Sequence, residues 1–332
     1  MNYKQIIYFG APGTGKSFEA KEILNTVKNE NIFRTTIHPE FTYSDFIGQL
    51  LPESDGGTKV DFVFKPGQFT EALKKAFSDS SVNVYLVLEE LSRGNVAAIF
   101  GDVFQLLDRD EYFKSMYPIR NKNVADQIVE LIGDEIYLPS NFNIIGTVNT
   151  NDQSVFPMDT AFKRRFDWEY ISVDPVKDKV TGEIKAKLNN PKIVVDKNNT
   201  KADSIELSWH AFYTSLNNFI TNKDKGLGRN EDRQIGQFFL DFNEDLVTKS
   251  QSNNTIESGK AQEEITKMIK NKLLLYLWQD VQGSSSLNGK SLFDETITSF
   301  DALYSTYDSD KVFSDSLINE FLVPNINKLA YV

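Results

Sequence analysis

The sequence predicts an α/β domain built on a parallel sheet, followed by a smaller α-helical domain. Two apolar runs, at residues 83–88 and 141–148, are almost continuous, which is typical of strands buried on both faces of a parallel sheet. Helical periodicity separates these runs in the first half of the chain, and beyond about residue 205 the pattern is helical. A chain of 332 residues is long enough to bury the cores of one large or two moderate domains.

The composition is that of a soluble globular protein, with 40% hydrophobic and 25% charged residues. There is no cysteine, which excludes disulfides and cysteine-based zinc sites. The two histidines, His38 and His210, are far apart in the sequence, so we expect packing or hydrogen-bonding roles for both. No run approaches the length of a membrane span and no charged leader opens the chain, so a cytoplasmic protein without membrane contact is expected.

The strongest motif lies between an apolar run at 6–9 and a helical pattern at 20–27. It consists of Gly10, Ala11, Pro12, Gly13, Thr14, Gly15, Lys16 and Ser17, which match the phosphate-binding loop G-x-x-x-x-G-K-[ST]. Such a loop turns backbone N–H groups toward a polyphosphate, its lysine contacts the phosphates and its serine binds Mg²⁺. An ordinary glycine-rich turn is the alternative. The motif grips phosphates rather than bases, so it predicts a GTP or ATP substrate without choosing between them.

A pair of acids follows the buried run at 83–88. Glu89 and Glu90 leave the carboxyl end of the predicted strand, where open α/β sheets hold their ligands. Beside a phosphate loop, the first acid is expected to support Mg²⁺ and the second to orient or deprotonate the attacking water. The alternative is a pair of solvated acids at a strand end.

Polar and basic residues follow the second buried run. Asn149 ends the strand at 141–148, where an amide can hydrogen-bond the γ-phosphate or the attacking water; a simple turn role is the equal alternative. Residues 158–166 predict a short helix ending in Lys163, Arg164 and Arg165. These cations could merely complement the helix dipole, or one arginine could reach a neighbouring subunit's γ-phosphate as an arginine finger.

The remaining elements can be assigned by pattern alone. The sequence predicts a strand at 32–37, a packed loop and short helix at 38–48, a hairpin insert at 53–67, a helix at 70–77, one amphipathic helix at 96–107, a second insertion at 110–137 with a helix over 124–132, and a strand at 167–173. The composition changes to Lys, Asn, Asp and Thr after residue 175. We therefore expect an α/β domain at 1–175, a linker or exposed hairpin at 176–205, and a helical domain at 206–332.

Together these stretches resemble the AAA+ motor subunit of McrB-type restriction systems. The similarity rests on residues 10–17, 38–48, 88–108, 141–154, 158–166 and 235–239. It implies an AAA+ fold with a five-stranded parallel sheet, hairpin inserts and a helical lid over the nucleotide. It also implies Glu89 as the Walker B acid, Glu90 as the catalytic acid and Asn149 as the sensor.

The resemblance further implies roles for four arginines and for partners. Arg164 and Arg165 become trans-acting residues, Arg93 orients groups at the subunit interface, and Arg233 is a weaker candidate for a nucleotide sensor in the lid. The resemblance also implies a homo-hexamer, a McrC-like endonuclease subunit as partner, and contact with DNA through the assembled complex. It implies GTP in preference to ATP as the substrate. The net charge of −11 argues against attraction of the whole surface to DNA.

The chain departs from the family pattern at two positions. The family usually has Asp in place of Glu89 and Arg in place of Gln153. The longer Glu89 would either displace the Mg²⁺ shell or act through a different water, and the role of the family's arginine in the subunit or partner interface is open at Gln153. The given sequence begins with the strand before the loop, so we expect the DNA-reading domain of many relatives either to lie outside this sequence or to be replaced by another subunit. The last fifty residues or so lie outside the similarity. Two other functions fit a phosphate loop: a MoxR-like protein remodeller, which a partner search would distinguish, and a monomeric small-molecule kinase, which would need no finger arginine.

Overall fold

The computed structural model describes residues 3–54, 60–149, 156–196, 204–283 and 289–326. Backbone proximity divides the chain into two compact units. The first contains Met1–Phe9 and Lys16–Tyr170, and the second contains Gly10–Gly15 and Ile171–Val332. The phosphate loop therefore groups with the second unit, although the strand before it and the helix after it belong to the first.

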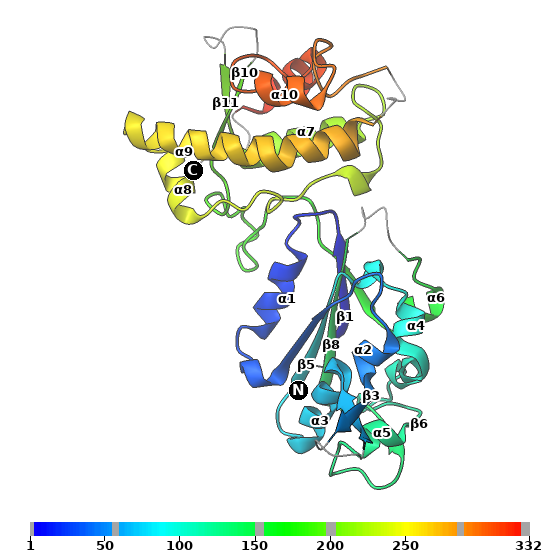
Figure 1. Ribbon diagram of the computed structural model, residues 1–332. Coiled ribbons are helices and arrows are strands. Elements are labelled where there is room, and N and C mark those ends of the chain that lie inside the picture. Colours follow the sequence, from blue (N-terminus) through cyan, green and yellow to red (C-terminus); the bar gives the residue numbers. More distant parts are fainter. Residues whose placement is uncertain (1–2, 55–59, 150–155, 197–203, 284–288, 327–332) are drawn as a thin grey trace. The chain divides into compact units, whose positions relative to one another are not determined.

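The first unit is built on a five-stranded sheet with the order β2-β5-β8-β1-β9 (Figure 1). Its strands are β1 (Gln5–Gly10), β2 (Ile32–Thr36), β5 (Val84–Glu89), β8 (Phe142–Asn149) and β9 (Asp167–Tyr170). The pairs β2 with β5, β5 with β8, and β1 with β9 are all parallel. The expected parallel sheet is confirmed, and β5 and β8 bring their carboxyl ends to the same edge.

Short helices cover this sheet. They are α1 (Lys16–Leu24), α2 (Tyr43–Ile47), α3 (Gln68–Ser78), α4 (Val96–Phe100), α5 (Lys122–Ala125) and α6 (Thr160–Lys163), with 3-10 turns at Asn29–Asn31 and Leu91–Arg93. Side chains cap several of them: Thr42 and Asp45 form a capping box on α2, and Asp159 accepts from the backbone N–H of Phe162 at the start of α6. Aromatic rings fill the core beneath α2, α3 and α4, where Phe46 contacts Phe69 and Phe100.

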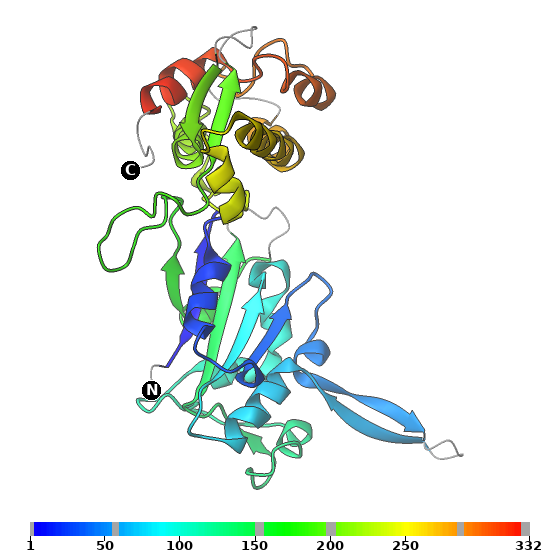
Figure 2. The ribbon, with the colours of Figure 1, turned by 90° about the vertical axis from the view of Figure 1, so that its left-hand side faces the viewer.

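Two small hairpins are inserted into the first unit. Strands β3 (Gly48–Ser54) and β4 (Val60–Pro66) pair antiparallel and project from the rest of the unit (Figure 2). The hairpin begins five residues earlier than the sequence pattern indicated, and residues 55–59 between its strands lie outside the described part of the chain. Strands β6 (Ile119–Arg120) and β7 (Glu135–Ile136) form the second hairpin.

Two helix predictions in the first unit were wrong. The amphipathic segment at 96–107 is not one helix, because α4 ends at Phe100 and a 3-10 helix continues over Gly101–Leu107. Gly101 adopts φ 48°, a conformation that ends regular helix geometry and suits glycine. The helix expected over 124–132 is limited to α5, and Ile132 is fully exposed. The apolar stripe of the segment 96–107 is buried.

The second unit is mainly helical. Its elements are β10 (Lys192–Asp196), β11 (Ser204–Ser208), α7 (Trp209–Thr221), α8 (Glu244–Ser250), α9 (Thr255–Met268), α10 (Phe300–Thr306) and α11 (Asp315–Leu317), with 3-10 turns at Glu231–Arg233 and Val323–Asn325. Helix α9 continues through π-helical stretches at Ile269–Leu274 and Leu277–Gln282, and a third follows α11 at Ile318–Leu322. Trp209, Phe212 and Phe219 of α7 are at the centre of its core.

The segment expected to be a linker or exposed hairpin is part of this core. Strands β10 and β11 pair antiparallel, and Ile193 and Val195 are buried against α7 and its neighbours. The alternation that predicted a hairpin was correct, but its apolar face is covered rather than exposed. In the described part of the chain no helix has both the length and the apolar character needed to cross a membrane.

Candidate nucleotide site

Glu90 and Asn149 meet at the carboxyl ends of β5 and β8. The Asn149 Nδ2 group donates to both carboxylate oxygens of Glu90, at 3.1 Å to Oε1 and 2.9 Å to Oε2. Glu90 has a left-handed backbone (φ 57°, ψ 41°), which is uncommon for a residue with a side chain and clusters at functional sites. This turn stops β5 and directs Glu90 toward the end of β8. The sequence predicted both residues, and the structure brings them together.

Arg93 completes this group, which we call the acid cluster (Glu90, Arg93 and Asn149). Its Nε lies 3.4 Å from Glu90 Oε2, and its backbone N–H donates to the Glu90 carbonyl within the turn that follows β5. Both side chains are partly exposed, at 50% for Arg93 and 32% for Glu90. The cluster therefore presents a carboxylate that is oriented by an amide and a guanidinium and is still open to water.

Glu89, the other acid of the pair, faces different partners. Its Oε1 lies 3.3 Å from Arg34 Nη1, and its Oε2 accepts a 3.4 Å hydrogen bond from Thr36 Oγ1. Both partners are on β2, which pairs with β5 so that Thr36 is opposite Glu89. The two consecutive acids thus contact separate groups, because Glu89 is the last residue of β5 and the left-handed backbone of Glu90 turns its side chain away from β2.

The phosphate loop is shaped by glycines with positive φ. Gly13 has φ 75° and Gly15 has φ 99°, and Thr14 Oγ1 donates to the Ala11 carbonyl at 3.1 Å inside the loop. Lys16 is the first residue of α1 and is 7% exposed, whereas Ser17 is exposed. The loop and the start of α1 have the form that the motif requires.

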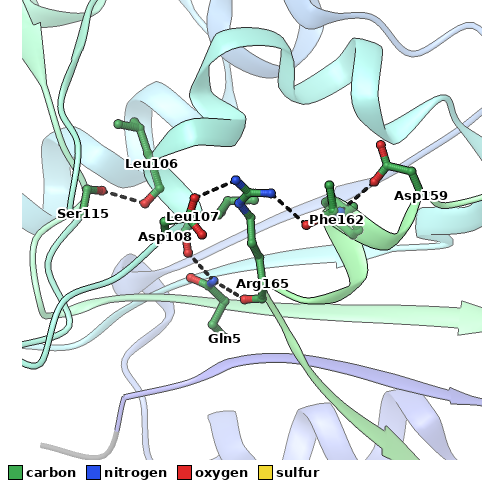
Figure 3. Close-up of polar contacts among 9 residues, drawn as sticks. Gln5, Leu106, Leu107, Asp108, Ser115, Asp159, Phe162 and Arg165 are labelled. Atoms are coloured by element: carbon green, nitrogen blue, oxygen red, sulfur yellow. Dashed lines mark hydrogen bonds and ion pairs between the residues drawn. The ribbon is translucent and has the colours of Figure 1, made fainter.

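Arg165 is held by contacts inside its own unit, and its role as a trans-acting arginine stays a prediction. Its Nη2 lies 2.6 Å from Asp108 Oδ2 (Figure 3). Its Nη1 donates to the Ala161 carbonyl, and its guanidinium lies 4.1 Å from the Phe104 ring centroid. The side chain is only 9% exposed. Its backbone carbonyl also accepts from the side chain of Gln5. A side chain fixed in this way stabilises the end of α6.

Arg164 differs from its neighbour in being exposed at the carboxyl end of α6. Among the described residues, no side-chain hydrogen bond or ion pair of Arg164 is found. Of the two predicted arginines, it is the one free to reach beyond the chain.

Arg233 is also engaged within its unit. Its Nη1 donates to the Asp280 carbonyl at 2.9 Å, and its own carbonyl accepts from the Tyr276 hydroxyl at 3.2 Å. These contacts join the turn Glu231–Arg233 to the π-helical continuation of α9. Its role as a nucleotide sensor stays a prediction.

Comparisons with known proteins agree with this geometry. The AAA domain family (dynein-related subfamily) matches residues 5–166, which include the phosphate loop, both acids and Asn149. The component YdiS of the type II restriction enzyme BsuMI from Bacillus subtilis (strain 168) is 32% identical over 338 residues, covering 93% of this chain and 87% of YdiS. The EcoKMcrB subunit of a type IV methyl-directed restriction enzyme from Escherichia coli (strain K12) is 29% identical over 178 residues. This chain belongs to the McrB-like AAA+ NTPases.

Membership confirms the AAA+ fold and a nucleotide-hydrolysing activity for this McrB-like chain. The match to EcoKMcrB covers 52% of this chain and 36% of that subunit. A solved structure described as an ATPase from Cytophaga hutchinsonii ATCC 33406 is 20% identical to this chain. The match covers 52% of this chain and 42% of that structure's chain. Its TM-score of 0.32 is too low to carry an argument.

Several partners of the site were not found from the sequence. The sequence does not reveal Arg34 and Thr36 as partners of Glu89, because this contact depends on the register of β2 and β5. Alternation along β2 places both side chains on the same strand face. Asp108 was overlooked as the partner of Arg165. Gln153, where the family usually has Arg, lies outside the described residues.

Proposed function

We propose that this McrB-like chain is a GTP-hydrolysing subunit of a homo-hexameric ring that drives a McrC-like endonuclease in DNA restriction. The observation that carries the catalytic part is the Asn149 amide donating to both oxygens of Glu90 at the edge of the sheet. The names of YdiS and EcoKMcrB, both restriction enzyme components, support the biological setting. The preference for GTP over ATP rests on the McrB resemblance.

In this proposal Glu90 orients and deprotonates the attacking water. Asn149 and Arg93 hold the carboxylate in one orientation, so that little reorganisation is needed when the proton transfers. The partial exposure of Glu90 leaves room for that water. Asn149 then acts by positioning Glu90 and by offering its amide near the γ-phosphate.

Ser17 and Glu89 would hold the Mg²⁺ ion. A hydroxyl and a carboxylate are the hard oxygen donors that Mg²⁺ takes together with substrate phosphates and water, so the residues fit. When bound, the ion would neutralise charge on the phosphates. Arg34 would fix the longer Glu89 side chain by its 3.3 Å contact with Oε1.

Arg164 is proposed as the residue that acts in trans. It is exposed, whereas Arg165 is fixed to Asp108, so one member of the pair anchors the helix end while the other extends from it. An arginine supplied by a neighbour stabilises the charge that develops on the transferred phosphoryl group. Hydrolysis would then require assembly.

The DNA is proposed to contact the assembled complex rather than this chain alone. A net charge of −11 disfavours a broad attraction to the phosphate backbone, which is the main source of non-specific affinity for DNA. A McrC-like subunit would supply the nuclease, a partner that the similarity to restriction enzyme components supports.

The test is a comparison of GTP and ATP hydrolysis, with mass measured by light scattering in the same samples. We expect a nucleotide-dependent hexamer that hydrolyses GTP with at least about tenfold higher kcat/KM than ATP, a difference of about 1.4 kcal/mol. Addition of a McrC-like subunit should yield DNA cleavage that needs hydrolysable nucleotide. A monomer that hydrolyses nucleotide at the full rate would contradict the proposal.

A further inference from the structure

The segment Ile235–Phe239, here called the loop-docking segment, makes main-chain hydrogen bonds to the phosphate loop within the second unit. The backbone N–H of Gly236 donates to the Pro12 carbonyl at 2.9 Å, and the N–H of Phe238 donates to the Gly13 carbonyl at 2.7 Å. These contacts join residues more than 220 positions apart. They involve the two peptide units in the middle of the loop.

The geometry points to a positioning role for this segment. In a trans peptide unit the C=O and the N–H point in opposite directions. A segment that binds the carbonyls of Pro12 and Gly13 on one side therefore directs the N–H groups of Gly13 and Thr14 to the other side. We propose that Gly236 and Phe238 set the orientation of the loop amides that bind the polyphosphate of the nucleotide.

The approach of the two backbones is close enough to require glycine on both sides. A Cβ atom at Gly236 would lie 2.3 Å from Thr14 Cα and 2.4 Å from the carbonyl carbon of Gly13. A Cβ atom at Gly13 would lie 2.3 Å from the backbone nitrogen of Phe239. Real Cβ atoms do not approach backbone this closely, so glycine at position 13 is required by this contact as well as by its φ of 75°.

Buried amides hold the loop-docking segment in place from behind. Asn217 pairs with the backbone of Ile235 through two hydrogen bonds, at 2.7 and 2.9 Å. The Gln237 carbonyl accepts from both Asn189 and the indole of Trp209, at 2.6 and 2.8 Å. Because these polar groups are buried and paired, the loop-docking segment is held in one conformation against the phosphate loop.

The inference rests on the proposed role of the phosphate loop, and inorganic tripolyphosphate tests that role separately because it has no base or sugar. The full chain, Gly236→Ala and the control Gly259→Ala would be titrated with tripolyphosphate by calorimetry. Gly259 is a matched control, since a Cβ atom there meets nothing within 4 Å. Failure of the wild-type chain to bind tripolyphosphate would overturn the role of the loop itself.

We expect Gly236→Ala to lose about 10- to 100-fold in tripolyphosphate affinity, the effect of misaligning one or two charge-assisted hydrogen bonds, and to raise KM for GTP more than it lowers kcat. Gly259→Ala should match the wild type. A second variant carries an ester in place of the amide between Gln237 and Phe238, which deletes the N–H of Phe238 and adds no side-chain atom. It decides the matter if Gly236→Ala does not fold. If Gly236→Ala folds and binds tripolyphosphate with wild-type affinity, the inference is overturned. If Gly236→Ala does not fold, wild-type tripolyphosphate affinity of the ester variant overturns it.

Discussion

The acid cluster and the phosphate loop are constructed in different ways. In the acid cluster, side chains from the ends of β5 and β8 contact one another, as Asn149 does when it donates to both oxygens of Glu90. In the phosphate loop, main-chain groups predominate, and Gly236 and Phe238 support the loop through its carbonyls. The difference teaches that substitutions should separate by kinetic effect: changes in the cluster should lower kcat, and changes behind the loop should raise KM.

Glu90→Gln is expected to have the largest effect. The amide cannot accept the proton of the attacking water, so kcat should fall by about 10³-fold while nucleotide affinity changes little. Stopped-flow release of phosphate under saturating GTP would measure the loss. Glu130→Gln, an exposed acid far along the chain, is the control. If Glu90→Gln instead raised KM by a similar factor and left kcat unchanged, the distinction between the acid cluster and the phosphate loop would be wrong.

Arg165→Ala should act on stability rather than on chemistry. The change leaves Asp108 without its 2.6 Å partner and exposes the Phe104 ring, which should lower the free energy of unfolding by about 2–4 kcal/mol. Urea titration monitored by circular dichroism checks this, with Arg164→Ala as the matched control that keeps wild-type stability. Equal stability of the two variants would show that the Arg165 contacts contribute nothing.

Asn149→Ala tests the orientation of Glu90 alone. Without the amide the carboxylate can rotate, and kcat should fall by about 10- to 50-fold, less than for loss of the acid itself. Asn149→Gln carries the same group on a longer side chain and should recover little, because the two contacts at 3.1 and 2.9 Å depend on reach. If Asn149→Ala raised only KM, its assignment to the acid cluster would be wrong.

His210 makes the support behind the loop sensitive to acid. Burial lowers the pKa of His210 to about 4, and its Nε2 lies 3.0 Å from the Leu188 carbonyl, which also accepts from Gln237. The unfolded chain binds a proton below about pH 6.5 and the folded chain does not, so stability must fall as pH falls. Between pH 7 and 5.5 we expect a loss of about 1 kcal/mol, which His210→Gln should abolish in urea titrations at both pH values.

Much of the fold was predictable because strongly buried strands leave continuous apolar runs. The runs at 83–88 and 141–148 located β5 and β8, and the polar residues after them located the acid cluster. Breaks within an element that are set by a local backbone conformation were not predictable in the same way. The break at Gly101 depends on a local backbone conformation within an apolar stripe that fits one helix equally well.

The candidate site was predictable only where side-chain type reveals the chemistry. Glu90 and Asn149 are recognisable by their place after strands, but nothing in the sequence distinguished Arg164 from Arg165, because the pairing with Asp108 arises from packing. The loop-docking segment was visible only as a match to the McrB pattern. Its contact with the loop uses backbone groups, which every residue carries and which leave no signature except glycine.

The central claim is that Glu90 of one subunit and Arg164 of the next form one hydrolytic site. The most direct measurement mixes Glu90→Gln with Arg164→Ala, each expected to be nearly inactive alone, and follows GTP hydrolysis. Random mixing completes about one quarter of the interfaces in a symmetric ring, so about one quarter of wild-type activity should return. A mixture no more active than its components, or an Arg164→Ala variant with full activity, would contradict the claim.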